Sequence, residues 1–250
     1  PSMGKTALAL HMALAVARKG KRVCFFSLEM TERQLVSRLL CMLSGVEPDK
    51  LRFKQLAEDD RAKLEAAAEE LDRLPLFLNY CSGCTFEEIR AKTMALHRRM
   101  PLDLIIVDYL NLIQVNPAGR GEVRDTMDLA LGDVCRKLKN LIMEADVAGI
   151  VLAQLNRNCE ARQDHVPVMS DLRDSGTIEQ VADCVAFIYR PERYGFTRDE
   201  KTGHSLVGVG KIYIAKNRNG STGIARFRYN PSFTRITDYI QPGTQTSLGL

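Results

Sequence analysis

Short apolar runs alternate along the chain with longer stretches in which apolar and polar residues recur at helical spacing. Residues 104–107 and 149–153 are continuously apolar, and residues 23–27, 76–79 and 184–189 form further short, β-rich runs. Strands that are apolar on both faces are typical of parallel sheets covered by helices on both sides. The pattern therefore predicts a mostly parallel sheet.

Helical stretches separate these runs. Two of them begin with the spacing of a capping box, in which Thr31 precedes Gln34 and Thr85 precedes Glu88 by three residues. The repeated strand and helix order predicts one α/β domain over residues 1–250, with helices on both faces of the sheet. The predicted helices cover residues 5–19, 31–44, 59–72, 85–99, 123–145 and 177–182.

The C-terminal part of the chain has a different pattern. Residues 211–215 and 224–229 alternate apolar and polar positions on either side of Asn219-Gly220. An Asn-Gly pair between two alternating runs is a strong signal for an antiparallel turn. We expect a C-terminal antiparallel hairpin that closes the sheet.

Composition narrows the class of protein without indicating an activity. Of the 250 residues, 45% are hydrophobic and 26% are charged, which is ordinary for a globular protein. The formal net charge of +4 is too small to indicate a nucleic-acid binder, so any nucleic-acid site must be local. No apolar run reaches the roughly 18 residues that a membrane span requires, and we expect a cytoplasmic protein with no membrane partner.

Seven cysteines form an odd, scattered set, which is typical of reduced thiols in a cytosolic protein. Only Cys81 and Cys84 form a Cys-x-x-Cys pair, and no second Cys or His pair follows at the spacing of a zinc site. A plain loop is the favoured interpretation of this pair, over a metal or redox site.

The first six residues match the second half of the phosphate-binding motif G-x-x-x-x-G-K-[ST], whose first glycine would lie two positions before residue 1. In such a loop, backbone N–H groups at the start of a helix converge on a phosphate, and the lysine neutralises phosphate charge. We expect a missing central strand upstream, so that residues 1–250 alone are unstable or inactive. The predicted nucleotide-binding residues of the loop are Ser2, Met3, Gly4, Lys5 and Thr6.

Asp108 ends the apolar run at residues 104–107, as the carboxylate of a Walker B strand would. By itself, Gly-Lys-Thr occurs by chance in many proteins, and an aspartate at a strand end is often only solvated. Together, the two features predict an ATP site in which the Thr6 hydroxyl and Asp108 hold Mg²⁺.

Five motifs occur in a definite order along the chain. They are Phe-Ser-Leu-Glu-Met at 26–30, Ile-Val-Asp-Tyr-Leu-Asn-Leu-Ile at 106–113, Gln-Leu-Asn-Arg at 154–157, Ser-Asp-Leu-Arg-Asp-Ser-Gly at 170–176 and Lys-Asn-Arg-Asn-Gly at 216–220. This series resembles the C-terminal motor domain of the DnaB-type replicative DNA helicases over nearly the full chain. The resemblance implies a RecA-like P-loop NTPase core.

The resemblance also implies catalytic roles. Glu29 corresponds to the general base that polarises the attacking water, and Gln154 corresponds to the residue that senses the γ-phosphate. This chain has Ala153 where family members often have serine. Lys216 and Arg218 correspond to the lysine and the arginine finger that reach the γ-phosphate of the neighbouring subunit. Without the surrounding motifs, two basic residues on a hairpin would more simply be a solvated face.

For DNA binding, the resemblance points to Arg173, Asp174 and Gly176, in a loop that holds the phosphates of single-stranded DNA. Asp174 stands where the family usually carries glutamate. A second candidate loop contains Arg120 and Arg124, although such loops are commonly just exposed. Phosphate contacts carry no base information, and the 6% aromatic content without Trp argues against base-stacking platforms.

The implied function is that of an ATP-dependent DNA helicase, which hydrolyses ATP to move along single-stranded DNA and unwind duplex. As implied partners, the family adds a homo-hexameric ring, a primase and a helicase loader. One alternative is a RecA-family recombination or clock-type ATPase, which would share Lys5, Thr6 and Asp108. Another is a nucleotide-gated DNA-binding scaffold that does not hydrolyse ATP.

Overall fold

A parallel sheet forms the centre of the fold in the computed structural model, which describes residues 3–114, 123–172, 175–200, 202–230 and 235–240. Its strand order is β2-β1-β3-β4. The register pairs Ser27 with both Tyr80 and Asp108, so the carboxyl ends of three strands lie at one edge. The strands are β1 (Val23–Ser27), β2 (Leu76–Tyr80), β3 (Leu104–Asp108) and β4 (Ala148–Val151).

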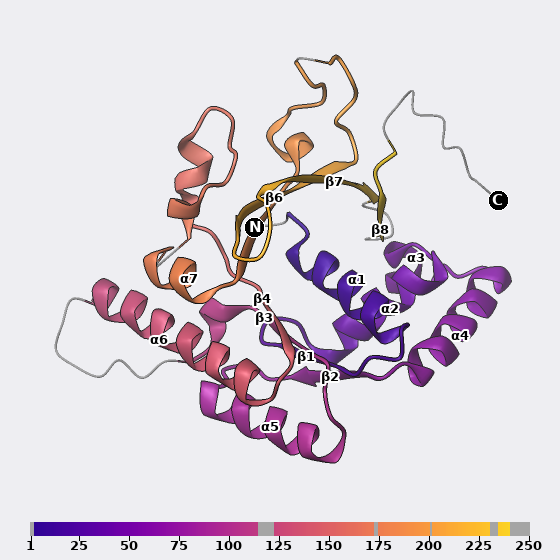
Figure 1. The fold of residues 1–250 in the computed structure, drawn as a ribbon. Coiled ribbons are helices and arrows are strands. Elements are labelled where there is room, and N and C mark those ends of the chain that lie inside the picture. The colour runs from indigo at the N-terminus through magenta and orange to yellow at the C-terminus, as the bar shows by residue number, and fades with distance from the viewer. Residues whose placement is uncertain (1–2, 115–122, 173–174, 201, 231–234, 241–250) are drawn as a thin grey trace.

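Helices cover this sheet on both faces, as predicted (Figure 1). Both predicted capping boxes form, at Thr31 with Gln34 and at Thr85 with Glu88. No helix in the described part of the chain combines the length and apolar character needed to cross a membrane. The helices are α1 (Lys5–Ala17), α2 (Glu32–Ser44), α3 (Pro48–Arg52), α4 (Glu58–Arg73), α5 (Phe86–Arg99), α6 (Val123–Glu144) and α7 (Ser175–Val181).

Successive residues of the central strands face opposite layers. Phe25 and Ile106 pack in one core with α1 and α2, whereas Phe26 and Val107 pack in the other core with α5 and α6. All five residues of β1 and of β3 are buried. Because both faces of these strands are covered, their sequences are continuously apolar up to the polar residue that ends each strand.

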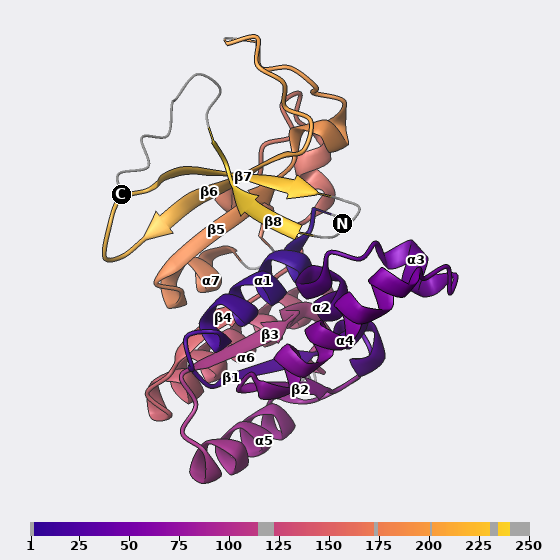
Figure 2. The same cartoon turned by 90° about the vertical axis from the view of Figure 1, so that its right-hand side faces the viewer.

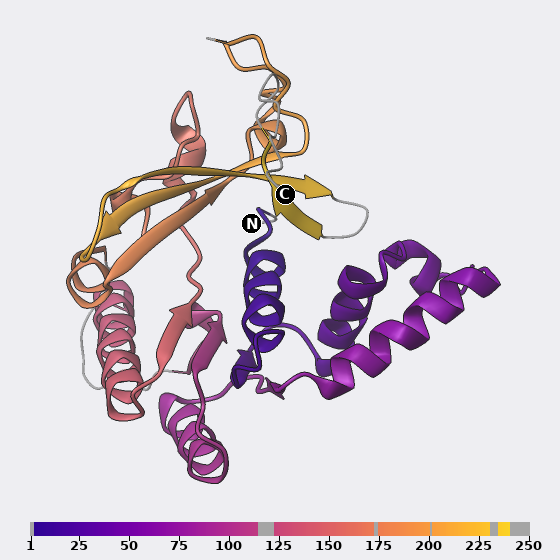
Figure 3. The same ribbon diagram turned by 45° about the vertical axis from the view of Figure 1, so that its right-hand side comes forward.

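A second, antiparallel sheet contains the C-terminal strands in the order β5-β6-β7-β8. Figures 2 and 3 show that it arches over the N-terminal end of α1, and β8 contacts α1. The predicted hairpin forms, but it belongs to this second sheet, because β5 pairs antiparallel with β6. The strands are β5 (Cys184–Tyr189), β6 (Val209–Asn217), β7 (Gly223–Asn230) and β8 (Arg235–Asp238).

A mainly apolar cleft of about 690 Å³ lies between β4 and β5. Both strands line it, together with side chains of α6 and α7. In the described part of the chain, β4 pairs only with β3, so its other edge faces the cleft. Met3 and Lys5 also line the cleft. The expected upstream strand itself stays a prediction.

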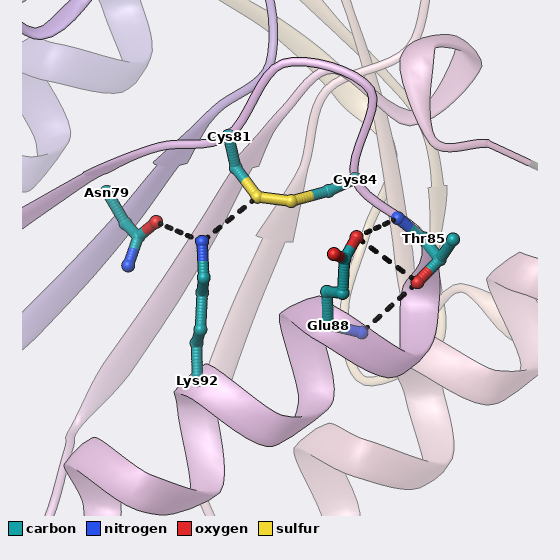
Figure 4. Close-up of a disulfide and its surroundings, with 6 residues drawn as sticks. All are labelled: Asn79, Cys81, Cys84, Thr85, Glu88 and Lys92. Atoms are coloured by element: carbon teal, nitrogen blue, oxygen red, sulfur yellow. Dashed lines mark hydrogen bonds between the residues drawn. A yellow bond between two sulfur atoms is a disulfide. The ribbon is translucent and has the colours of Figure 1, made fainter.

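The Cys-x-x-Cys pair differs from its prediction. Cys81 and Cys84 form a disulfide at the carboxyl end of β2, where they are almost fully buried (Figure 4). The turn brings their Cα atoms to 5.5 Å, within the range that a disulfide can bridge. Lys92 Nζ donates to Cys81 Sγ at 3.2 Å and to the side chain of Asn79 at 3.3 Å. The expectation of reduced thiols is therefore wrong for these two residues, because the Ser-Gly turn folds the cysteines together.

Gly210 of β6 gives a test of the second sheet. Gly210 is paired in register with Phe227, and a Cβ atom at position 210 would overlap the Phe227 ring. We expect Gly210→Ala to lower the free energy of unfolding by about 1–3 kcal/mol, because the buried ring must move. Gly223→Ala is the matched control, since nothing lies within 4 Å of a Cβ there. Urea denaturation measures both, and equal stabilities for the two variants would contradict the packing.

Candidate functional site

The phosphate loop ends at Gly4, which is the N-cap residue of α1. Gly4 has φ 93° and ψ 24°, a left-handed conformation that favours glycine. No side chain in the described residues caps α1, and its first turn has no acidic residue. The first N–H groups of α1 therefore remain available, at the end of the helix where the dipole attracts an anion. Met3 is half-buried beside them, and Ser2 lies outside the described residues.

The structure brings Lys5 and Thr6 to Asp108, which lies 102 residues beyond Thr6 in the sequence. Thr6 Oγ1 donates a hydrogen bond of 2.7 Å to Asp108 Oδ2. Asp108 is only 1% exposed, and its Oδ1 has no hydrogen-bond partner in the described part of the chain. Lys5 Nζ donates to the carbonyl oxygen of Ala153 at 3.0 Å and lies 4.7 Å from the centre of the Tyr109 ring.

Burial shifts the two charged groups in opposite directions. Desolvation lowers the pKa of Lys5, and the nearby Asp108 and Glu29 carboxylates oppose that shift. Desolvation also raises the pKa of Asp108, while the Thr6 hydrogen bond, Lys5 and Arg38 oppose it. Both charges are thus incompletely compensated by the protein. A cation beside Asp108 and an anion beside Lys5 would each remove an electrostatic penalty.

Glu29 lies in the connection that follows β1, at the same edge of the sheet. Its side chain is exposed, and its charge affects the pKa of Lys5, Asp108 and Tyr109. Ser27, which is fully buried, shapes this connection because its Oγ donates to the Met30 carbonyl at 2.7 Å and accepts from the Met30 N–H at 3.1 Å. The sequence motif contained Ser27, but its spacing gave no indication of this positioning contact.

Gln154 follows β4, and its backbone N–H donates to Asn111 Oδ1 at 3.1 Å. The next residue, Leu155, forms an antiparallel bridge with Leu172. Asn156 N–H also donates to the Asp171 carbonyl at 2.8 Å. The segment carrying Gln154 is therefore bonded directly to the residues that precede Arg173 in sequence.

Asp171 is a buried carboxylate that sequence reasoning missed. It is 1% exposed and forms an ion pair with Arg162, whose Nη1 lies 2.9 Å from Asp171 Oδ1. It also accepts the Val168 N–H at 2.8 Å, and the Arg162 hydrogen bond holds its pKa below the usual range. Nine residues separate the partners in a loop, so no periodic pattern indicates the pair.

Tyr229 of the antiparallel sheet borders the phosphate loop, and Arg190 packs against Tyr229. A Cβ at Gly4 would lie 3.7 Å from Tyr229 Cε2, and the Arg190 guanidinium stacks 3.8 Å from the centre of the Tyr229 ring. Arg190 is 2% exposed and bonds to Glu192, but its Nε and Nη1 have no partner in the described residues. Neither residue belongs to a recognisable sequence motif, so this contact could not be predicted from the sequence.

Lys216 and Arg218 do lie together, as their spacing predicted, but away from the phosphate loop of the same chain. Lys216 Nζ donates to the carbonyls of Ala182, at 2.7 Å, and Glu179. Arg218 Nη1 donates to Asp183 Oδ1 at 3.0 Å, and Nη2 donates to the Gln180 carbonyl at 3.1 Å. Both side chains are thus bound to the C-terminal end of α7.

Of the predicted DNA-contacting residues, Gly176 is exposed in the first turn of α7. Arg173, Asp174 and Arg120 lie outside the described residues. Arg124 belongs to the first turns of α6, but its side chain is also outside the description.

Comparison with known proteins gives one consistent family. The model of the family described as "DnaB-like helicase C terminal domain" matches residues 1–238. The replicative DNA helicase DnaC of Bacillus subtilis (strain 168) is 38% identical over 239 residues, which cover 95% of this chain and 50% of that protein. The replicative DNA helicase DnaB of Geobacillus stearothermophilus is 37% identical over 239 residues, with the same coverage. The chain thus spans about half the length of the curated relatives it matches.

Two solved structures are also similar. One is an ATPase domain, which superposes with a TM-score of 0.86 and 30% identity, covering 96% of this chain and 82% of that one. The other is a DnaB-like replicative helicase, whose structure is described together with its interactions with primase, and it gives a TM-score of 0.85 and 30% identity. That match covers 96% of this chain and 56% of the other. The likeness confirms the predicted RecA-like fold class.

The Arg162–Asp171 pair gives a stability test. We expect Arg162→Ala to lower the free energy of unfolding by about 2–3 kcal/mol, because it leaves a buried carboxylate unpaired. Since the pKa of Asp171 is lowered in the folded state, the pair's contribution is present above the unfolded pKa of about 3.9 and is lost as pH falls through the folded pKa. Urea denaturation at pH 7 and below pH 4 should therefore show a difference that shrinks in acid.

Arg73→Ala is the matched control, because the Arg73–Glu69 pair is exposed on α4. It should change stability by less than about 1 kcal/mol. Equal losses for the two variants at pH 7 would contradict the importance of the buried pair.

Proposed function

Because this chain belongs to the DnaB-like helicase C-terminal domain family, we propose that it is the ATP-hydrolysing motor of a replicative DNA helicase. The observation that carries the proposal is the meeting of Lys5, Thr6 and Asp108 at the carboxyl edge of the parallel sheet, with Glu29 beside them. Phosphoryl transfer requires positioning and charge neutralisation more than covalent help, and these residues supply both.

The site fits a nucleotide with Mg²⁺. Oxygen ligands suit Mg²⁺, and the Thr6 hydroxyl and Asp108 carboxylate supply them, with Asp108 Oδ1 still unpartnered in the described residues. Lys5 and the first N–H groups of α1 would hold the phosphates. When bound, Mg²⁺ neutralises charge on the phosphates during transfer. We propose ATP as the nucleotide.

Glu29 and Gln154 serve different parts of the cycle in this proposal. Glu29 is exposed at the same edge of the sheet, where its carboxylate could accept a proton from a water that attacks the phosphate. Gln154 is linked through Leu155 to Leu172, which is adjacent to Arg173 in sequence. A change at the phosphate end can therefore pass along bonded backbone toward the segment that we assign to DNA.

Lys216 and Arg218 act on the site of a neighbouring subunit in this proposal. Within one chain their hydrogen bonds go to α7 and Asp183, and none of those described reaches Lys5, Thr6 or Asp108. Lys216 and Arg218 would need a second copy to reach a transferred phosphate, where they would add to the charge that Lys5 supplies. This requirement supports a ring of identical subunits, which we propose to be a hexamer.

Single-stranded DNA is the proposed track. We assign Arg173, Asp174 and Gly176 to one DNA-binding segment, and Arg120 and Arg124 to a second. Contacts to phosphates would be independent of sequence and sensitive to salt. One similar solved structure describes a DnaB-like replicative helicase and its interactions with primase. We therefore propose primase and a helicase loader as partners of the whole protein.

The general-base assignment is tested with Glu29→Gln in the full-length protein. We expect the variant to bind ATP but to lose ATP turnover by about 100-fold or more, because an amide cannot take the water's proton. Turnover is measured with and without single-stranded DNA. Glu32→Gln, an exposed change in the first turn of α2, is the control and should behave as wild type. Wild-type protein that binds but never hydrolyses ATP would favour the scaffold alternative.

Action in trans is tested by mixing two inactive variants. An Arg218→Ala subunit keeps Glu29, and a Glu29→Gln subunit keeps Arg218, so mixed rings contain intact composite sites only if Arg218 serves the neighbour. With random mixing in equal amounts, roughly a quarter of the sites should be intact, and turnover should reappear. Mixed rings that stay as inactive as either parent would place Arg218 in the site of its own chain.

A further inference from the structure

Asp183 joins three elements at the point where Lys216 and Arg218 are bound. It lies between α7 and β5, and its two carboxylate oxygens have different partners. Asp183 Oδ1 accepts from Arg218 at 3.0 Å, and Oδ2 accepts from Lys139 of α6. The Asp183 carbonyl also accepts the Arg218 N–H at 2.7 Å. The end of β6, the end of α7 and the later turns of α6 therefore meet at one residue.

The end of α7 completes this arrangement. The last carbonyls of a helix lack partners within the helix and attract cations. Here the carbonyls of Glu179 and Ala182 accept from Lys216, and the carbonyl of Gln180 accepts from Arg218. Both cations are thus held by groups of their own subunit.

Both helices that meet at Asp183 begin at proposed DNA-binding segments. Gly176 lies in the first turn of α7, close in sequence to Asp183, and Arg124 lies in the first turns of α6. Figure 1 shows α7 beside α6, and the two helices are in contact. At 1.5 Å per residue, a helix as short as α7 is about 10 Å long. The start of α7 is therefore close to the groups at its end that bind Lys216 and Arg218.

We propose that Asp183 is a positioning residue that couples DNA binding to the catalytic cations. In the absence of DNA, Asp183 holds the Arg218 guanidinium on its own subunit. Strand binding at the start of α7 shifts the helix, weakens this contact and frees Arg218 for the neighbouring site. This inference rests on the proposed function, in which Arg218 acts in trans.

The strength of the contact suits such a switch. The Arg218 and Asp183 side chains are 52% and 48% exposed, and ion pairs this exposed contribute little to stability. Lys139, which is 28% exposed, keeps the carboxylate in place from the α6 side. A contact this exposed biases the position of Arg218 by a factor of about five at most, which a bound strand can reverse.

The test compares the DNA stimulation of ATP turnover in full-length hexamers, with oligo(dT) as the probe. For Asp183→Asn we expect turnover without DNA to rise by about fivefold, the factor that corresponds to roughly 1 kcal/mol, so that the stimulation ratio falls by the same factor. Affinity for oligo(dT) should rise by a factor of up to about five, because coupling is reciprocal and the strand no longer has to break this contact. Asp183→Glu restores the charge and should restore most of the ratio.

Asp133→Asn is the matched control, because Asp133 pairs with Lys137 on α6 and has no described contact with α7 or Arg218. A stimulation ratio in Asp183→Asn equal to that of wild type and of this control would overturn the proposal. Equal loss of turnover with and without DNA, in intact hexamers, would also overturn it.

If Asp183→Asn fails to form hexamers, Lys139→Gln replaces it, since it releases the carboxylate from α6 without touching Arg218. A reduced stimulation ratio in Lys139→Gln supports the proposal, and an unchanged ratio overturns it. Failure of the proposed function would look different. In that case, wild-type protein itself would show no DNA-stimulated turnover, or the mixed rings of Arg218→Ala and Glu29→Gln would stay inactive.

Discussion

The hydrogen bond between Thr6 and Asp108 ties the first helix to the middle of the parallel sheet. Asp108 ends a strand whose residues are all buried, so its charge has almost no access to water. A buried carboxylate needs polar partners, and the start of α1 brings Thr6 and Lys5 close enough to supply them. Apolar packing sets the direction of α1, while this polar contact fixes where its first turn must lie.

The strand ends around Asp108 are ordered by polar side chains that bond to backbone. Ser27 shapes the turn before Glu29, and Asn111 holds the N–H of Gln154. Because these groups fix backbone position, the neighbouring side chains remain free for a ligand. A similar arrangement occurs at the end of α7, where backbone carbonyls and Asp183 hold the side chains of Lys216 and Arg218.

Much of the fold follows from local sequence. The runs at β1, β3 and β4 and the capping boxes at Thr31 and Thr85 were sufficient to predict strands and helices, because each depends on neighbouring residues. The strand β8, the short helix α3 and the separation of β5 from the parallel sheet depend on tertiary packing and were not predicted. In the site, motif order indicated Lys5, Thr6 and Asp108, which do meet. Asp171 with Arg162 and Arg190 with Tyr229 carried no signal, because their partners meet only after the chain has folded.

The contact of Gly4 with Tyr229 has a consequence for the order of events during protein synthesis. The phosphate loop is bordered by Tyr229 of β7, which is translated long after Gly4, and β8, later still, packs on α1. Contacts this distant in sequence form late, and a chain emerging from the ribosome has its N-terminal part exposed first. The parallel sheet can assemble early, whereas the side of the phosphate loop that Tyr229 borders is closed only after β7 has been translated.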